Sequence, residues 1–204
     1  MRIAIVAFDG FDELDVFITL GLLNRVTALE WKAEVASPAV QVTSMNGVTV
    51  QAQRPLEFAN EAGAVVFAGG LYNRAIGDPA SETGALLDRL QLDPLSQSIG
   101  ALSSGSLLLA RLGLLGDMPA CTDAATKPWL VAAGVRVEDA PFHARGPIAT
   151  AGGSLAATYL AAWVIAKRAG WQAAGDALRL AAPVAEHERF VEQVFGVVRP
   201  FVEG

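Results

Sequence analysis

The sequence predicts an α/β protein: a three-layer sandwich around a mostly parallel central sheet, built as a single domain over residues 1–204. Three observations support this prediction. Short apolar segments alternate along the chain with longer segments whose apolar residues recur at helical spacing. The short segments are continuously apolar, as in parallel strands that are buried on both faces. The chain has 204 residues, of which 52% are hydrophobic and 18% charged, and this is enough for one sizeable core.

Strand and helix patterns alternate through the first half of the chain. The first strand leads into a helix for which Asp12 is the expected N-cap, and Asn46-Gly47 favours a type I′ turn within a hairpin. The predicted elements are strands at 2–8, 31–37, 64–67 and 98–102, helices at 11–29, 83–92 and 106–115, and the hairpin at 40–50.

The second half continues this alternation without an internal repeat, a low-complexity tract or a linker. Gly152-Gly153-Ser154 is expected to open a long apolar helix that ends near residue 169. The other predicted elements are an extended segment at 119–122, a helix at 127–133, strands at 135–138, 142–145 and 148–151, a helix at 172–180 and a last helix from residue 186.

Composition disfavours several classes of protein. The net charge of −6 and the lack of a Lys/Arg run argue against nucleic-acid binding. No apolar run is long enough to predict a membrane span, and the N-terminal apolar run, which ends at Asp9, fits a strand better than a signal peptide. Cys121 is the only cysteine, which excludes an internal disulfide and a cysteine zinc cluster. We therefore expect no metal, no other cofactor and a cytoplasmic location.

The most informative segment is Ser103-Ser104-Gly105, which joins a predicted strand directly to a helix. Such a sharp turn exposes a side chain at the N-terminal end of a helix, where negative charge is favoured. The carboxyl ends of parallel strands meet at one edge of a sheet. We therefore expect Ser103 to share a cleft with Gly69-Gly70, and Asp15, one turn into the first helix, to reach the same cleft.

A serine hydroxyl needs a positioned base, and only two histidines are present. The spacing of His143 and His187 from Ser103 does not require either to serve in this way. Asp15 is the better acid–base candidate, because a carboxylate among apolar helix residues has a raised pKa. The alternative is that the Asp15 carboxylate only stabilises the N-terminus of the helix. If the helix register differs from the expected one, Glu13 is the acid–base candidate in place of Asp15.

Each other candidate has a structural alternative. Ser103 and Ser104 are equally suited to capping the following helix. Gly69 and Gly70 are either backbone donors to an oxyanion or a tight loop after a buried strand. Cys121 is either a displaced nucleophile or, more commonly for a lone cysteine, a buried small hydrophobe.

Four segments, in this order, resemble the ThiJ/PfpI superfamily, which has a flavodoxin-like, class I glutamine amidotransferase-like fold. They are F-D-G-F-D-E-L-D ending at Asp15, V-V-F-A-G-G ending at Gly70, S-S-G-S-L-L-L-A-R-L-G-L-L from Ser103, and I-A-T-A-G-G-S-L-A-A-T-Y. The isonitrile hydratase-like and regulator-associated branches are the most similar in pattern. The resemblance implies that Asp15 faces the nucleophile, that Gly70 gives a backbone N–H to the oxyanion, that Ser104 hydrogen-bonds a substrate atom, and that the chain forms a homodimer.

The sequence departs from the superfamily's pattern at three places. Ser103 stands where the nucleophilic cysteine of the superfamily falls, and Asp123 stands where a histidine commonly follows. Ile18-Thr19 replaces a common Gly-Pro in the first helix. The missing thiol and imidazole remove the groups that the superfamily's usual reaction needs.

Two functions are compatible with these residues. The first is a hydratase- or hydrolase-like enzyme acting on a small molecule through Ser103 and Asp15, with Ser104, Gly69, Gly70 and Asp123 around the substrate. The second is a catalytically inactive member that binds or senses a small molecule, or serves as a structural dimeric module. Protease or amidase activity ranks last, because no activated nucleophile is visible.

For the expected dimer, the C-terminal segment offers apolar residues that look exposed, although the same helix pattern fits packing on its own domain. These residues are Phe195, Val197, Val198 and Phe201.

Overall fold

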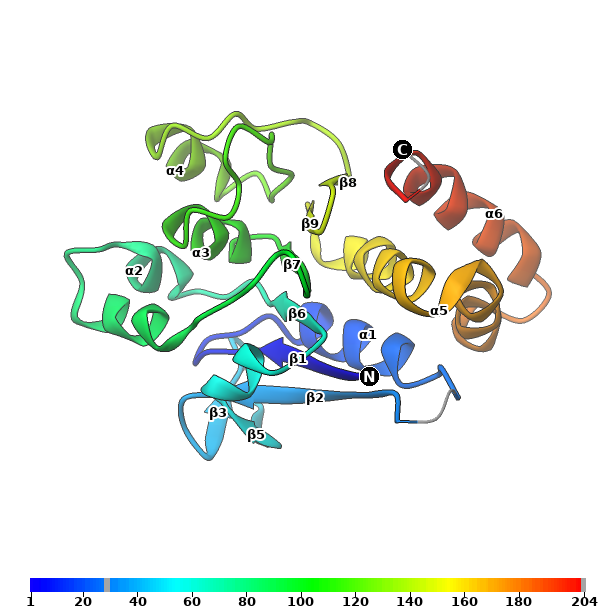
Figure 1. Ribbon diagram of the computed structural model, residues 1–204, viewed down its shortest axis with the longest axis horizontal. Helices are drawn as coiled ribbons and strands as arrows, with labels where there is room; N and C mark the ends of the chain where they lie inside the picture. The colour runs from blue at the N-terminus through cyan, green and yellow to red at the C-terminus, as the bar shows by residue number, and fades with distance from the viewer. Residues whose placement is uncertain (28–29, 203–204) are drawn as a thin grey trace.

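The computed structural model describes residues 1–27 and 30–202 and confirms the predicted sandwich (Figure 1). Its central sheet has seven strands in the order β5-β2-β1-β6-β7-β9-β8, and every neighbouring pair is parallel except β8 with β9. The strands are β1 (Arg2–Val6), β2 (Lys32–Ser37), β5 (Arg54–Pro55), β6 (Ala64–Phe67), β7 (Ser98–Leu102), β8 (Phe142–Arg145) and β9 (Ile148–Ala151).

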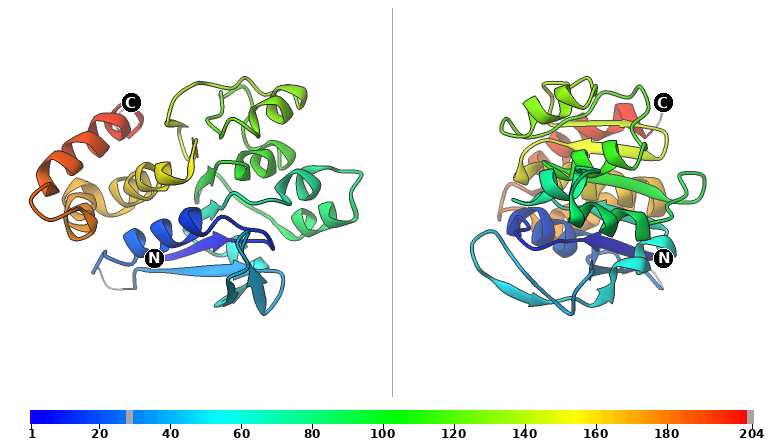
Figure 2. Two further views of the ribbon diagram at one scale, coloured as in Figure 1. Left: turned by 180° about the vertical axis from the view of Figure 1, so that it is seen from behind. Right: turned by 90° about the vertical axis from the view of Figure 1, so that its left-hand side faces the viewer.

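Helices cover both faces of this sheet (Figures 1 and 2). One face carries α1 (Glu13–Leu23), α5 (Ala157–Ala181) and α6 (His187–Val198), which share an apolar cluster with Ile3 and Ile5 of β1. Ala4 and Val6 point to the other face. There they pack with η1 (Leu56–Asn60), α2 (Asn73–Gly77), η2 (Glu82–Arg89), α3 (Gly105–Arg111) and α4 (Lys127–Ala132). Because both faces are covered, the central strands are apolar throughout, as the sequence pattern indicated.

Several element boundaries differ from the predictions. The first helix begins after Asp12, whose carboxylate caps it as predicted, but it ends at Leu23, because Asn24 exchanges two hydrogen bonds with Ala33 of β2. The remainder of the helix predicted over 11–29 is therefore not helical up to residue 27, and residues 28–29 lie outside the described residues. The helix predicted from residue 106 begins at Gly105 and ends at Arg111.

Other elements change in kind. The segment predicted as a helix at 83–92 is the 3₁₀ helix η2, and the strand predicted at 135–138 is reduced to a single bridge between Val137 and Ala120. The two helices predicted on either side of residue 170 are confirmed: together they make up α5, and they meet at Gly170, whose φ of 88° and ψ of 167° are not helical. The segments β5, η1 and α2 are not among the predicted elements.

The predicted hairpin is a separate two-stranded sheet of β3 (Gln41–Thr43) and β4 (Thr49–Gln51), which pair antiparallel around Gly47 at φ 86°. A bridge between Ser44 and Phe11 ties it to the start of α1. Glu13 holds it further by accepting hydrogen bonds from the Ser44 hydroxyl and from Asn46 Nδ2, the latter at 2.9 Å. The hairpin therefore lies beside the carboxyl end of β1.

The C-terminal apolar residues pack on their own domain. Val198 is fully buried, Phe195 stacks edge-on against Trp171 at 4.8 Å, and Phe201 stacks against Phe142 at 5.5 Å after the short η4 (Arg199–Phe201). The interpretation of these residues as an exposed dimer surface was wrong, because the last helix covers α5. None of the helices in the described ranges has the length and apolar character that a membrane crossing requires.

Candidate functional site

The site forms where β7 turns into α3. Ser103 has a φ of +47°, a left-handed conformation that L-residues adopt at a cost in free energy and that is enriched at functional sites. The surrounding structure fixes this turn. Ser103 N–H donates to the Ala151 carbonyl (2.9 Å), and the Ser103 carbonyl accepts from the hydroxyls of Ser106 (2.7 Å) and Thr122 (2.9 Å). The predicted sharp strand-to-helix turn is therefore present.

Two glycines allow the neighbouring backbones to approach this turn. A Cβ atom on Gly105 would lie 2.6 Å from the Phe67 carbonyl oxygen of β6. A Cβ atom on Gly69 would lie 2.6 Å from Asp15 Oδ2 and 2.9 Å from the Ser103 Cβ. Only glycine fits at either position, and the absence of side chains brings Asp15, Gly69 and Ser103 together.

Ser104 joins the turn to the loop after β6. Its hydroxyl donates to the Gly70 carbonyl (3.0 Å) and accepts from the Gly70 N–H (2.9 Å) and from Asn73 Nδ2 (3.3 Å). It makes no side-chain cap for α3, so the capping interpretation of Ser104 was wrong. The Ser104 side chain instead fixes the conformation of the glycine loop.

The N–H groups of Gly69 and Gly70 both have partners within the protein. Gly69 N–H donates to Asp15 Oδ2 at 2.8 Å, and Gly70 N–H donates to the Ser104 hydroxyl. Each of these hydrogen bonds would have to break, or be shared, before the N–H group could donate to an oxyanion. Within the described part of the chain, the backbone N–H groups of Ser104 and Gly105 have no acceptor, so they are the donors left without a partner at the turn.

Asp15 is fully buried, and its Oδ1 atom has no hydrogen-bond partner among the described residues. Burial raises the pKa of its carboxyl from 3.8 to about 7, and repulsion from Asp12 and Asp123 adds to this increase. The hydrogen bond from Gly69 N–H acts in the opposite direction. Asp15 thus combines a position beside Ser103 with a pKa suited to proton transfer near neutral pH.

The neighbouring acids of α1 have structural partners. Asp12 Oδ1 accepts from the N–H groups of Leu14 (2.8 Å) and Asp15 (3.4 Å), and Asp12 Oδ2 accepts from the Ser154 hydroxyl (2.6 Å). Glu13 points to the hairpin, and the hydrogen bond from Ser44 lowers the pKa of its carboxyl. The structure therefore brings Asp15, and not Glu13, to the turn.

A cavity of about 270 Å³ opens in front of Ser103. Asp123 lines it while its carboxylate accepts hydrogen bonds from the backbone N–H (2.9 Å) and hydroxyl (2.7 Å) of Thr126, at the start of α4. Among the described residues that line the cavity, none is a lysine, an arginine or a histidine. The lining includes the predicted Gly69, Gly70, Ser103, Ser104 and Asp123.

Sequence reasoning missed several residues of the lining, which are Met45, Leu71, Ala125, Thr126, Trp129, Gly153 and Ser154. Ser154 follows Gly152-Gly153 at the carboxyl end of a parallel strand, so the rule that identified Gly69 and Gly70 applies to it as well. Nothing in the sequence pattern pointed to Trp129, because its place depends on how α4 packs.

Three reactive side chains considered from sequence lie outside the cavity. His143 is on the edge strand β8, where its Nδ1 atom lies 2.6 Å from Glu138 Oε2. His187 is at the first turn of α6. Cys121 is fully buried, and burial raises the pKa of its thiol to about 12. Neither the imidazoles nor the thiol line the cavity with Ser103.

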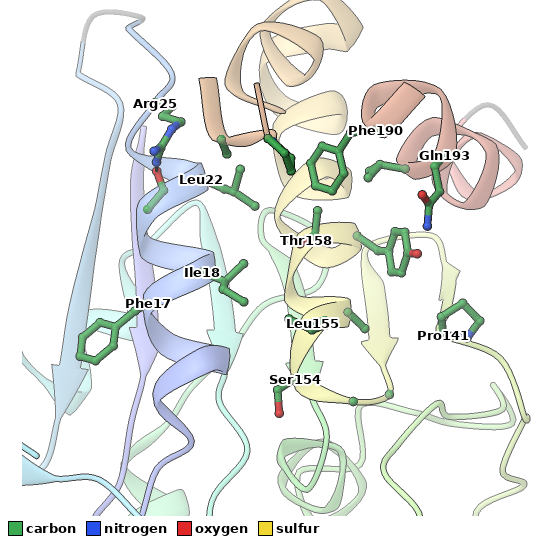
Figure 3. A pocket seen from close by; sticks show the side chains of 18 residues that line it. Phe17, Ile18, Leu22, Arg25, Pro141, Ser154, Leu155, Thr158, Phe190 and Gln193 are labelled. Carbon is green, nitrogen blue, oxygen red and sulfur yellow. Dashed lines mark hydrogen bonds between the residues drawn. The ribbon is translucent and has the colours of Figure 1, made fainter. Parts of the chain in front are cut away.

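A larger groove of about 860 Å³ lies between α1, α5 and α6 (Figure 3). Its walls are mainly apolar, with Ile18 and Leu22 facing Leu155 and Phe190 across the gap. Residue Ser154 stands at the lower end of the groove in Figure 3 and also lines the cavity in front of Ser103. Gly153 and Ser154, at the start of the short η3 (Ser154–Ala156), therefore line both hollows.

Solved structures with this fold support the assignment of the architecture. Schizosaccharomyces pombe DJ-1 superposes with a TM-score of 0.73 at 16% identity, covering 90% of this chain and 100% of that chain. A ThiJ/PfpI family protein from Pseudomonas syringae superposes with a TM-score of 0.74 at 18% identity, covering 97% of this chain and 87% of that chain. An AraC family transcriptional regulator from Pseudomonas putida superposes with a TM-score of 0.73 at 19% identity, covering 89% of this chain and 99% of that chain. At these identities the likeness shows the fold alone.

Family membership is shown by the sequence itself. Among curated proteins, no sequence matches this chain significantly. The model of the DJ-1/PfpI family matches residues 1–167, which include the turn at Ser103, the glycine loop and Asp15. The chain belongs to the DJ-1/PfpI family.

Proposed function

We propose that this chain binds a small molecule in the cavity in front of Ser103 and does not use Ser103 as a covalent nucleophile. One observation carries the proposal: among the described residues, no imidazole or lysine amine lines the cavity that the serine faces. A serine hydroxyl is a weak acid and attacks only when such a base takes its proton. The strained turn and the cavity are nonetheless retained, and both suit ligand binding.

A second candidate is a hydratase-like enzyme that works by acid–base catalysis, in line with the isonitrile hydratase-like branch that the sequence resembles. The position of Asp15 favours it, since this carboxyl lies beside Ser103 and has a pKa of about 7. In such a reaction Asp15 would transfer the proton and Ser103 would orient water or substrate.

The two candidates differ in their dependence on Ser103 and Asp15. The test measures turnover of isonitriles, glyoxals and small amides by the wild type and by the Ser103→Ala, Ser103→Cys and Asp15→Asn variants. We expect no turnover by the wild type, with folding retained in all variants. Turnover that is lost in Asp15→Asn but kept in Ser103→Ala supports the hydratase-like candidate. Turnover that is lost in Ser103→Ala contradicts the proposal that Ser103 is not catalytic.

A sensing role in the cytoplasm and a homodimeric state complete the proposal. The neighbour described as an AraC family transcriptional regulator supports a sensing role, since a protein with that description shares this fold. The homodimer has a candidate surface around the start of α1, where large apolar side chains are 41–73% exposed. These are Leu14, Phe17, Met45, Val48, Leu71 and Leu155.

These apolar side chains belong to four segments that the structure ties together at one place. The bridges of Phe11 with Ser44 and with Gly70 join the start of α1 to the hairpin and to the glycine loop. The hydrogen bond between Asp12 and Ser154 adds the loop that carries Leu155. Met45 and Leu71 of this patch line the cavity, and Phe17 and Leu155 line the larger groove, so the patch adjoins the mouth of the cavity and a second copy placed there would lie against the site.

A further inference from the structure

We propose that the cavity in front of Ser103 takes a small organic cation, namely a primary amine in its ammonium form carried on a compact apolar frame. This inference rests on the proposed function, because it names the class of ligand for the same cavity. It depends on the charge of the cavity lining, on free acceptor capacity at that lining, and on the nature of the remaining walls.

The cavity lining carries negative charge without a compensating cation. Asp12 and Asp123 both line it, and Asp15 lies directly behind Gly69 and Ser103. Asp12 and Asp123 are near enough to Asp15 for their charges to oppose its ionisation. Within the described ranges, neither carboxylate of the lining forms an ion pair with a lysine or an arginine. Such a cavity repels anions and attracts cations.

The carboxylates also retain acceptor capacity. Each carboxylate oxygen accepts about two hydrogen bonds. Asp12 Oδ2 accepts one, from Ser154, and each oxygen of Asp123 accepts one, from Thr126. The carboxyl of Asp15 is buried behind Gly69 and Ser103 and does not line the cavity, so the acceptors open to a ligand are those of Asp12 and Asp123. An ammonium group has three N–H donors and no acceptor, so it matches this arrangement better than a hydroxyl or a carboxylate does.

The remaining walls are apolar and limit the size of the ligand. Met45, Leu71 and Trp129 also line the cavity. The guanidinium of Arg74 lies 4.7 Å from the centre of the Trp129 ring, but Arg74 does not line the cavity. A volume of about 270 Å³ suits a ligand of one ring or a short branched chain.

The experiment compares three probes that share one ring and differ in charge: benzylamine, benzyl alcohol and benzoate. Binding to the full chain is measured by calorimetry and by shifts of the Ser104 and Thr126 amide resonances. We expect benzylamine to bind at least about tenfold more tightly than benzyl alcohol, and benzoate to bind least. Rising salt should weaken the binding of benzylamine alone.

Two substitutions that remove the same charge provide the matched control. Asp123→Asn keeps an oxygen that can accept from Thr126 and should weaken benzylamine binding by about fivefold or more, leaving benzyl alcohol unchanged. Asp88→Asn alters an exposed carboxylate on η2 that pairs with Arg111, and should change neither. Equal effects of the two substitutions would overturn the inference.

The outcomes separate this inference from the proposed function. Binding of benzyl alcohol or benzoate at the cavity as tightly as benzylamine overturns the cation preference while leaving a small-molecule site in place. Failure of all three probes to bind contradicts the proposed function, and the inference falls with it.

Discussion

At the scale of single residues, the burial of Asp15 makes the stability of the fold depend on pH. Its carboxyl has a pKa of about 7 in the folded chain and an ordinary value of 3.8. Between these two values the unfolded chain gives up a proton that the folded chain keeps. The free energy of unfolding therefore falls as pH rises through this window, and the loss ends above about pH 7.

Replacing Asp15 with asparagine removes this dependence and keeps an oxygen that can accept from Gly69 N–H. We expect the free energy of unfolding of the wild type to fall by up to roughly 4 kcal/mol, relative to that of Asp15→Asn, as the pH rises from 4 to 8. Urea unfolding of both proteins across this range measures the difference, in which the other carboxylates cancel. A difference that does not change with pH would show that Asp15 titrates normally in the folded chain.

At the scale of elements, α3 packs against β6 only because Gly105 has no side chain. In the Gly105→Ala variant, the new Cβ would meet the carbonyl oxygens of Phe67 at 2.6 Å and Ala68 at 3.1 Å, which belong to backbone and cannot turn away. We expect a loss of about 1–3 kcal/mol in the free energy of unfolding. Gly21→Ala is the matched control, since the nearest atom to its Cβ is the flexible end of Arg25 at 3.4 Å.

The control should stabilise α1 by up to about 1 kcal/mol, because alanine is a better helix former than glycine. If the close approach of two backbones, rather than chain flexibility, explains the glycine at residue 105, the urea midpoint falls in Gly105→Ala and rises in Gly21→Ala, each relative to the wild type. Equal destabilisation by both would refute this explanation.

The predictable part of the fold and of the site came from local signals. Continuous apolar runs identified the strands β1, β6 and β7, and the rule that ligands meet the carboxyl ends of parallel strands brought Ser103 and the glycine loop together. The end of α1 at Leu23 was not predictable, because it depends on Asn24 reaching β2. The sequence placed Asp15 at the same cleft as Gly69, but their hydrogen bond was not predicted, because the Gly69 N–H was expected to serve an oxyanion.

At the scale of the whole molecule, the exposed apolar patch beside the cavity mouth predicts self-association. Leu155 is 73% exposed there, whereas Leu95 is 98% exposed on the loop before β7, away from the patch. Changing either leucine to glutamate adds one charge to an exposed position. Only the change at residue 155 places that charge within the patch, where an interface between two copies would bury it without a partner.

Light scattering at micromolar concentration then measures the mass of each protein. We expect the wild type and Leu95→Glu to have twice the 21.3 kDa mass of one chain, and Leu155→Glu to have the mass of a single chain. A wild type at 21.3 kDa would exclude the dimer. Dissociation by Leu95→Glu, with Leu155→Glu still dimeric, would instead place the interface away from the cavity. Because Met45 and Leu71 of the patch line the cavity, loss of the dimer in Leu155→Glu should also speed ligand exchange, as solvent then reaches the site directly.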